Sequence, residues 1–364
     1  MSENAKQENR IAIRLPNWVG DAVMATPALR SIRAGYPGAR ITLVGKPGLL
    51  NLLNGLPYFD ERIPVTGRGF RHVVGLALQL RKHRHHLGLI LPNSFSSAFS
   101  FMLGGVKKRT GYALNGRSPL LNRSIRPVME GLKRRPAPMT GYYMELARFA
   151  GGADTGEEVH LTTDRALDEA AERFLVQNGL DKSRPLIGLN PGASFGASKL
   201  WTSDGFAHVA DRVAEDLGGR TLLLCGPGEE DLADAILART RHPMVDTSRR
   251  VLPLDQLKSM IAKLSGLVTT DTGPRHFAAA FQVPCVVIMG PTDPRYTAYP
   301  SDFTRVLRRE VDCGPCHKKV CDTDHRCMRE ITGEQVFDSL KETMKLKETM
   351  DRNGTQLRGG EVTR

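Results

Sequence analysis

Long hydrophobic runs are missing from this sequence. Across its 364 residues, no apolar stretch approaches the roughly 20 residues that are needed to span a bilayer. The first ten residues, MSENAKQENR, are polar and contain no apolar signal-peptide core. These two absences predict a cytoplasmic protein without a transmembrane segment.

Aromatic residues are few, with seven tyrosines and two tryptophans, although the net charge is +12. A platform that stacks single-stranded nucleic acid interleaves basic and aromatic side chains. The basic clusters lack that pattern, so we expect no nucleic-acid partner. An anionic membrane surface or a polyanionic substrate would explain the charge, whereas solvated loops are the simpler interpretation of any one cluster. The clusters are RKHRHH (81–86), VKKRTGY (106–112) and GLKRRPAP (131–138).

Complete nucleotide-binding fingerprints are also missing. CGPGEED (225–231) begins like the dinucleotide motif GxGxxG but lacks its third glycine, and NPGASFGASKLW (190–201) lacks the spacing of a Walker A loop. The incomplete GxGxxG motif argues against a nicotinamide-dependent dehydrogenase. Both segments nevertheless follow apolar runs, so each is a candidate loop at the end of a strand.

Apolar runs alternate with helical patterns along most of the chain, which predicts parallel sheets covered by helices. The polar stretch after residue 151 and the restart of the pattern near 186 predict two similar α/β halves that meet at a cleft. We place the first α/β domain at 1–165, the second at 166–332, a helix that could bridge them at 333–350 and a disordered tail at 351–364. The strand candidates are 11–15, 41–46, 87–93, 186–192, 221–226, 267–271 and 285–290.

Asp21 lies in LPNWVGDAVMATPALRSIR (15–33), where the first predicted strand gives way to a helix. If the helix begins at Asp21, the carboxylate is a cap and Pro27 introduces a kink. If it begins at Thr26, Asp21 is free for chemistry. Ligands in open parallel sheets bind beyond the carboxyl ends of the strands, and Asp21 lies at such an end.

The segment LVTTDTGPRHFAAA (267–280) combines a strand end with a helix start at Pro274. Backbone N–H groups around Thr272 and Gly273 would form an anion site there, with His276 in the first turn. Lys199, in the small-residue loop after the 186–192 strand, would add a positive charge. An ordinary strand–turn–helix and a solvated lysine are the simpler alternatives.

The six cysteines divide into two sets. Cys225 and Cys285 lie in apolar runs and are expected in the core. Cys313, Cys316, Cys321 and Cys327 form CGPCHKKVCDTDHRC, in which a CxxC pair precedes two further cysteines. Such a set can bind Zn²⁺ or an iron–sulfur cluster, although its second pair is irregularly spaced and a thiol-rich surface loop is the alternative.

Taken together, these motifs resemble glycosyltransferase family 9, the heptosyltransferases of lipopolysaccharide assembly. The resemblance runs through LPNWVGDAVMATPALRSIR, LPNSFSSAF (91–99), NPGASFGASKLW and TTDTGPRHFAAAF. These stretches, with the cysteine segment, look more like type II than type I members. The resemblance implies a GT-B fold, in which the second Rossmann-like domain holds ADP-heptose and the first holds the acceptor, heptosyl-Kdo-lipid A.

The resemblance also implies site residues. Asp21 matches the catalytic aspartate of an inverting transfer, and no cofactor or catalytic metal is expected. Asp271, Thr272, Gly273 and His276 match the donor motif, and Lys199, Ser194, Glu229 and Glu230 lie near other donor-contacting positions. Asn93 and Ser94 are expected to contact the acceptor. Lys107, Lys108, Arg109 and Arg123 are expected to bind its anionic groups at the cytosolic face of the inner membrane.

Three alternatives stay open at this point. A type I enzyme would transfer heptose to Kdo, and another GT-B enzyme, such as a nucleotide-sugar epimerase, would act without an acceptor. A noncatalytic nucleotide-sensing module would not need a general base such as Asp21.

Overall fold

The computed structural model describes residues 10–67, 69–131, 133–180 and 183–353, and the chain divides into two compact units. Unit 1 comprises Met1–Asp164 with Pro294–Pro300, and unit 2 comprises Arg165–Asp293 with Ser301–Arg364. We predicted the division at 165/166; in the structure it falls between Asp164 and Arg165.

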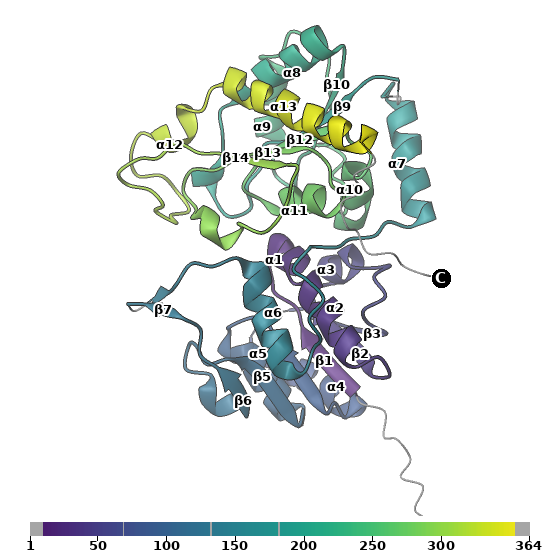
Figure 1. The fold of residues 1–364 in the computed structure, drawn as a ribbon, viewed down its shortest axis with the longest axis vertical. Helices are drawn as coiled ribbons and strands as arrows, with labels where there is room; N and C mark the ends of the chain where they lie inside the picture. The colour runs from purple at the N-terminus through teal and green to yellow at the C-terminus, as the bar shows by residue number, and fades with distance from the viewer. Residues whose placement is uncertain (1–9, 68, 132, 181–182, 354–364) are drawn as a thin grey trace, which may run out of the picture. The chain divides into compact units, whose positions relative to one another are not determined.

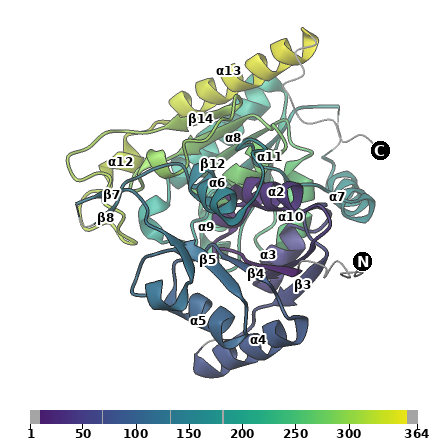
Figure 2. The same cartoon turned by 60° about the horizontal axis from the view of Figure 1, so that its bottom comes forward.

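Unit 1 is built on a parallel sheet with strand order β3-β2-β1-β4-β5-β6 (Figure 1). Helices α2 and α6 pack together on one face, and α4 and α5 pack together on the other (Figure 2). The strands are β1 (Arg10–Arg14), β2 (Arg40–Gly45), β3 (Glu61–Pro64), β4 (Leu87–Ile90), β5 (Lys108–Tyr112) and β6 (Arg123–Ile125). A small antiparallel hairpin, β7 (Met129–Glu130) and β8 (Lys133–Arg134), follows them. The helices are α1 (Val19–Met24), α2 (Thr26–Gly35), α3 (Pro47–Leu52), α4 (Phe70–His83), α5 (Phe95–Leu103), the 3₁₀ turn η1 (Ser118–Leu120) and α6 (Met139–Ala150).

Unit 2 repeats this plan with strand order β11-β10-β9-β12-β13-β14, again parallel. Both orders are those of a doubly wound Rossmann-like sheet. The strands are β9 (Leu186–Asn190), β10 (Arg220–Leu223), β11 (Val245–Asp246), β12 (Gly266–Thr270), β13 (Cys285–Ile288) and β14 (Thr304–Leu307). The helices are α7 (Arg165–Gln177), α8 (Ser203–Leu217), α9 (Glu230–Leu237), α10 (Leu254–Ile261), α11 (Gly273–Ala280), α12 (Arg326–Arg329) and α13 (Gly333–Arg352), with 3₁₀ turns η2 (Ala197–Lys199) and η3 (Pro294–Tyr296).

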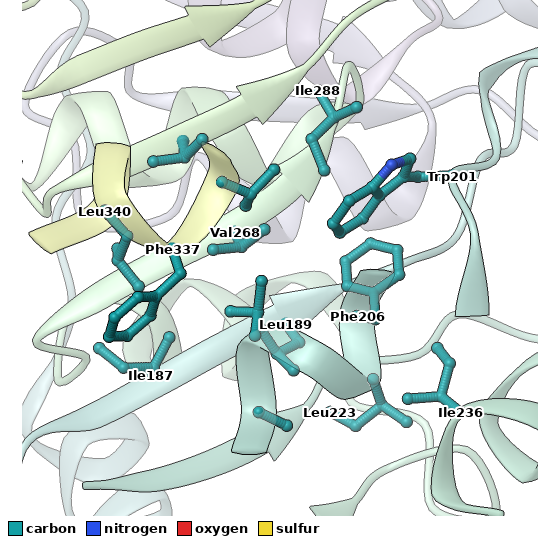
Figure 3. Close-up of a cluster of buried hydrophobic side chains, with 14 of the residues drawn as sticks. Ile187, Leu189, Trp201, Phe206, Leu223, Ile236, Val268, Ile288, Phe337 and Leu340 are labelled. Atoms are coloured by element: carbon teal, nitrogen blue, oxygen red, sulfur yellow. The ribbon is translucent and has the colours of Figure 1, made fainter. Parts of the chain in front are cut away.

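The core of unit 2 lies between its sheet and helices α8, α9 and α13 (Figure 3). Phe206 of α8 and Phe337 of α13 are fully buried against strand residues such as Leu189 and Val268. Each fully buried side chain of this size contributes roughly 1.5–3 kcal/mol relative to an exposed one. This core anchors α13 to the sheet.

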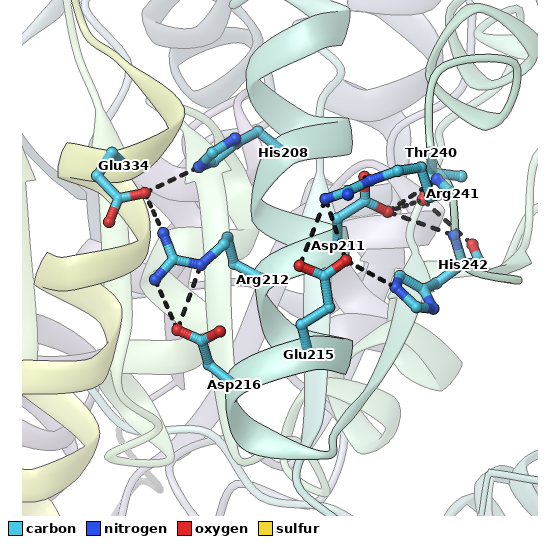
Figure 4. Close-up of polar contacts among 9 residues, drawn as sticks. All are labelled: His208, Asp211, Arg212, Glu215, Asp216, Thr240, Arg241, His242 and Glu334. Carbon is cyan, nitrogen blue, oxygen red and sulfur yellow. Dashed lines mark hydrogen bonds and ion pairs between the residues drawn. The ribbon is translucent and has the colours of Figure 1, made fainter.

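Ion pairs along α8 add a second attachment for α13 (Figure 4). Arg212 donates to Asp216, one turn further along α8, at 2.6 Å and also pairs with Glu334 of α13. Glu334 lies in the first turn of α13, where a negative charge is favourable. We predicted that this helix could bridge the two domains; its contacts with α8, β12, β13 and β14 lie within unit 2. Asp351 and Arg352 of the predicted tail belong to α13, and residues 354–364 lie outside the described residues.

Two short helices, α1 and α2, follow β1 in place of one long helix. Helix α1 runs from Val19 to Met24 and α2 begins at Thr26, so the helix start that we considered at Thr26 is present, whereas the earlier helix begins at Val19 rather than at Asp21. Pro27 lies in the first turn of α2, where its missing N–H breaks no helical hydrogen bond. The kink expected from a single long helix is therefore replaced by a break at Ala25.

Among the residues that the structure describes, no helix is both long and apolar enough to cross a membrane.

Candidate active site

Asn190 organises the carboxyl edge of the unit 2 sheet. It is the last residue of β9, and its Oδ1 accepts hydrogen bonds from Thr269 Oγ1 and Thr272 Oγ1, both at 3.0 Å. Its Nδ2 donates to the carbonyl of Leu224 at 2.8 Å. One buried amide thus fixes the ends of β9, β10 and β12 relative to one another. We did not predict this residue from the sequence, although an asparagine that closes the apolar run LIGLN is a usable signal.

The start of α11 supplies a backbone donor at this edge. Thr272 precedes the helix in an extended conformation, with φ −136° and ψ −178°, and directs its hydroxyl to Asn190. Gly273 and Pro274 then form the first turn. The N–H of Thr272 donates to the carbonyl of Thr270 at 2.8 Å, and Pro274 has no N–H, so the N–H of Gly273 is the donor at this helix start that is suited to an anionic ligand.

Beside α11, Asp271 is the centre of a buried ion-pair cluster. Its Oδ2 accepts from Lys199 Nζ at 2.8 Å and from Thr292 Oγ1 at 2.7 Å, and its Oδ1 accepts from Arg275 at 2.8 Å. Burial alone would raise the pKa of Asp271, but Arg275 and Lys199, with the hydrogen bonds from Lys199 and Thr292, hold that pKa well below its ordinary value. The two cations and one anion leave a net charge of +1 beside the start of α11. Lys199 is thus part of this cluster rather than a solvated lysine.

His276 contributes no positive charge here. It is 3% exposed, and burial followed by the repulsion of Arg275 lowers the pKa of its ring to about 3. The imidazole is therefore neutral at pH 7.

Unit 2 should lose stability as the pH falls below about 6.5, the ordinary pKa of histidine. Between pH 6.5 and 3 the unfolded chain binds a proton at His276 that the folded chain does not bind, so unfolding is favoured as pH falls. The slope from this ring is at most about 1.4 kcal/mol per pH unit. Urea titrations followed by Trp201 fluorescence at several pH values measure it. His276→Asn should flatten the slope, and an unchanged slope in this variant would contradict the assignment.

Of the two glutamates that we considered, Glu229 is the one directed at the strand-end loops. Its Oε2 accepts from the backbone N–H of Gly226 at 2.7 Å, and a Cβ placed at Gly192 would collide with its carboxyl group. Burial raises the pKa of Glu229, and the hydrogen bond from Gly226 opposes that rise. Glu230 is exposed as the first residue of α9, and Ser194 is exposed in the loop after β9.

In unit 1, Asp21 is the third residue of α1, beyond the carboxyl end of β1. It is partly exposed, and its Oδ1 accepts a hydrogen bond from Tyr143 Oη at 3.1 Å. Burial raises the pKa of Tyr143, and the Asp21 charge raises it further, so the phenol keeps its proton and can orient the carboxylate. Trp18, the residue before α1, is exposed near Asp21 and was missed in our sequence analysis.

Asn93 and Ser94 lie at the same edge of the unit 1 sheet as Asp21, after β4. Asn93 accepts from Arg117 at 3.0 Å and donates to Tyr142 Oη at 2.9 Å. Ser94 precedes α5, and its hydroxyl accepts from the backbone N–H of Ser97 at 3.4 Å. Both side chains therefore help to build this edge.

The four basic residues that we assigned to the acceptor lie at the opposite edge. Lys108 begins β5 and pairs with Leu87, the first residue of β4, while Arg123 begins β6. Lys107 and Lys108 are exposed, whereas Arg109 donates to the carbonyls of Leu120 and Val106. Because all strands in this sheet are parallel, the structure does not bring these residues together with Asp21.

Comparison with known proteins identifies the family. The model of glycosyltransferase family 9 (heptosyltransferase) matches residues 73–326. The chain belongs to glycosyltransferase family 9. The predicted α/β class with two Rossmann-like units, as in GT-B glycosyltransferases, is confirmed, and so is the prediction of a glycosyltransferase.

Relatives of this family 9 member cover nearly its whole length. Lipopolysaccharide heptosyltransferase 2 of Escherichia coli K12 is 29% identical over 91% of this chain and 97% of its own. The solved structure of E. coli ADP-heptose lipopolysaccharide heptosyltransferase II matches 93% of this chain and 99% of its own, with a TM-score of 0.78 and 27% identity. Lipopolysaccharide heptosyltransferase 1 of Pseudomonas aeruginosa is 24% identical over 86% of this chain and 87% of its own.

Proposed function

We propose that this chain transfers L-glycero-D-manno-heptose from ADP-heptose to the first heptose of the Kdo-lipid A inner core. The observation that carries the proposal is the similarity to E. coli heptosyltransferase 2, which extends over 91% of this chain. The P. aeruginosa heptosyltransferase 1 is less similar and covers less of the chain, which favours the type II reaction over transfer to Kdo.

Unit 2 would hold the donor. The N–H of Gly273 at the start of α11 and the net positive charge of the Lys199–Asp271–Arg275 cluster are suited to a diphosphate. Glu229, fixed against Gly226, would accept hydrogen bonds from the hydroxyl groups of a nucleoside or sugar. As ADP leaves, these preorganised donors and charges stabilise the negative charge that develops on it. We therefore propose that transfer needs no catalytic metal ion.

Unit 1 would supply the base. In an inverting transfer the acceptor hydroxyl attacks the anomeric carbon while a carboxylate removes its proton and the bond to ADP breaks. Asp21 is suited to this role because it is partly exposed and its Oδ1 is held by Tyr143. The exposed indole of Trp18 offers a surface on which a sugar ring could stack.

The reaction is tested with a panel of acceptors and product detection by mass spectrometry. ADP-heptose with heptosyl-Kdo-lipid A should give a product heavier by one heptose, also in the presence of EDTA. Addition of heptose only to Kdo-lipid A would indicate the type I reaction, and conversion of ADP-heptose without any acceptor would indicate an epimerase. Either outcome would contradict the proposal.

We also propose that the enzyme works in the cytoplasm and associates peripherally with the inner membrane. The hairpin of β7 and β8 follows the carboxyl end of β6, so it leaves the sheet at the edge where Asp21 lies. Val128 and Met129 are 58% and 45% exposed beside the exposed Arg126 and Arg135. Exposed apolar side chains flanked by arginines are suited to an anionic lipid surface.

Replacing Val128 and Met129 together by aspartate should reduce co-sedimentation with vesicles that contain phosphatidylglycerol. The two carboxylates remove apolar contact and repel the anionic surface. Val176→Asp is the matched control, because Val176 is 71% exposed on α7 of unit 2. If both variants sediment like the unmodified protein, the hairpin is not the membrane contact.

A further inference from the structure

Four cysteines line one small cavity in unit 2. The cavity has a volume of about 30 Å³ and lies among Gly290, Pro291, Val311 and the segment 313–327. All four thiols are free, and only Cys327 is buried. The volume suits a single ion and is far too small for a nucleotide. The four cysteines are Cys313, Cys316, Cys321 and Cys327.

All four cysteine side chains line this one cavity, although Cys313 and Cys327 are 14 positions apart in the sequence. An arbitrary thiol-rich loop would not require its cysteines to converge in this way.

The segment that carries the cysteines has little regular structure to hold it. It runs from the end of β14 at Leu307 to the start of α12 at Arg326. Connections of this length within a compact domain are uncommon unless they serve a function. A shared ligand for the four thiols would supply the cross-links that strands and helices do not supply here.

We propose that Cys313, Cys316, Cys321 and Cys327 together bind one thiophilic metal ion, with Zn²⁺ as the expected occupant. Four thiolates are a complete tetrahedral ligand set for such an ion, and CxxC is a usual spacing for the first pair. Within the described parts of the chain, no three His, Cys, Asp or Glu side chains already stand at ligating positions. Binding therefore requires the thiols to turn into the cavity that they line. Each of the four loses its S–H proton to solvent as a metal–sulfur bond forms.

This site would also brace the loop that carries Lys199. Ser198 donates from its hydroxyl to the carbonyl of Lys318 at 2.5 Å and from its backbone to the carbonyl of Lys319 at 3.0 Å. Nε2 of His325 lies 2.7 Å from the Ser198 carbonyl. The cysteine segment thus makes three hydrogen-bond contacts with Ser198, the residue next to Lys199. We infer that the metal helps to position Lys199, a step that depends on the proposed donor site.

The test is elemental analysis of the full chain purified without added metal. We expect about one Zn²⁺ per chain, retained in Cys285→Ala, which alters a buried core cysteine, and lost in the double variant Cys313→Ser/Cys316→Ser. About one iron per chain, visible by its colour and lost in the same variant, would support the tetrathiolate site with a different occupant. Less than about 0.1 metal per chain, with no uptake of Zn²⁺ or Co²⁺ under reducing conditions, would overturn it, as would disulfides between these cysteines in freshly purified protein.

Because the double variant could fail to fold, the unmodified protein provides a second measurement. Mercurial modification of its thiols should release the metal to a chromogenic chelator, and metal without such release would overturn ligation by cysteine. ADP affinity by calorimetry tests the bracing step separately. A metal-free variant that folds and binds ADP normally would overturn that step and leave the metal site standing. A metal-loaded chain that transfers no heptose would contradict the proposed function alone.

Discussion

Asp21→Asn should lower kcat by about 10²–10⁴-fold, the range that a positioned general base contributes. Asparagine has the same shape and can still accept the hydrogen bond that Tyr143 donates at 3.1 Å. It cannot remove a proton from the acceptor hydroxyl. Because Asp21 belongs to unit 1 and the residues that we propose to bind the donor belong to unit 2, the affinity for ADP should stay unchanged. Steady-state kinetics and calorimetry with ADP measure the two quantities.

Two further variants are compared with Asp21→Asn. Tyr143→Phe removes the hydroxyl that orients Asp21, so it should reduce kcat less and shift the pH profile of kcat. Asp154→Asn, which alters an exposed carboxylate paired with Arg148, should behave like the unmodified enzyme. Turnover of Asp21→Asn close to that of Asp154→Asn would refute the assignment of the base.

Asp271→Asn should destabilise unit 2 by about 3–5 kcal/mol, the usual effect of removing one member of a buried ion pair. The substitution leaves Lys199 and Arg275 buried without the carboxylate that each contacts at 2.8 Å. Urea unfolding followed by fluorescence of the buried Trp201 reports on this unit. Because the cluster also adjoins the start of α11, ADP affinity should fall as well.

The matched control is Asp204→Asn, in which the carboxylate paired with Arg239 has a side chain 83% exposed. Solvent screens such a pair, so the expected loss is about 1 kcal/mol or less. If the free energies of unfolding of the two variants were equal, the buried Asp271 cluster would not stabilise unit 2 more than an exposed ion pair does.

The central strands were predictable because they are buried on both faces. Runs such as IAIRL and LIGLN are apolar except at one position each, which is close to the pattern of an interior parallel strand. One interior strand, β5, was not predicted, because its sequence KRTGY begins with two basic residues and was assigned to a charge cluster. The edge strands were not predicted either: β3 is ERIP, β6 is RSI and β11 is VD. They are short and polar because one side faces no neighbouring strand, so composition does not separate them from loops.

The candidate site was predictable in part. Asp271 and Thr272 follow an apolar run directly and Asp21 follows one after a short loop, and the end of a strand is a position that sequence can locate. A cluster of charged residues does not indicate at which edge of the sheet it lies. Lys107 and Arg123 were assigned to the acceptor from charge alone, but the strand register puts them at the edge opposite Asp21. The role of Asn190 depends on hydrogen bonds to residues about 80 positions away, which local patterns do not reveal.

The most direct measurement of the central claim is NMR of the linkage formed from ADP-heptose and heptosyl-Kdo-lipid A. The unmodified enzyme should join the two heptoses with anomeric configuration opposite to that of the donor, and Asp21→Asn, saturated with ADP-heptose, should form almost none of this product. Retention of the donor's configuration, or equal product from both proteins, would contradict a single-displacement transfer with Asp21 as its base.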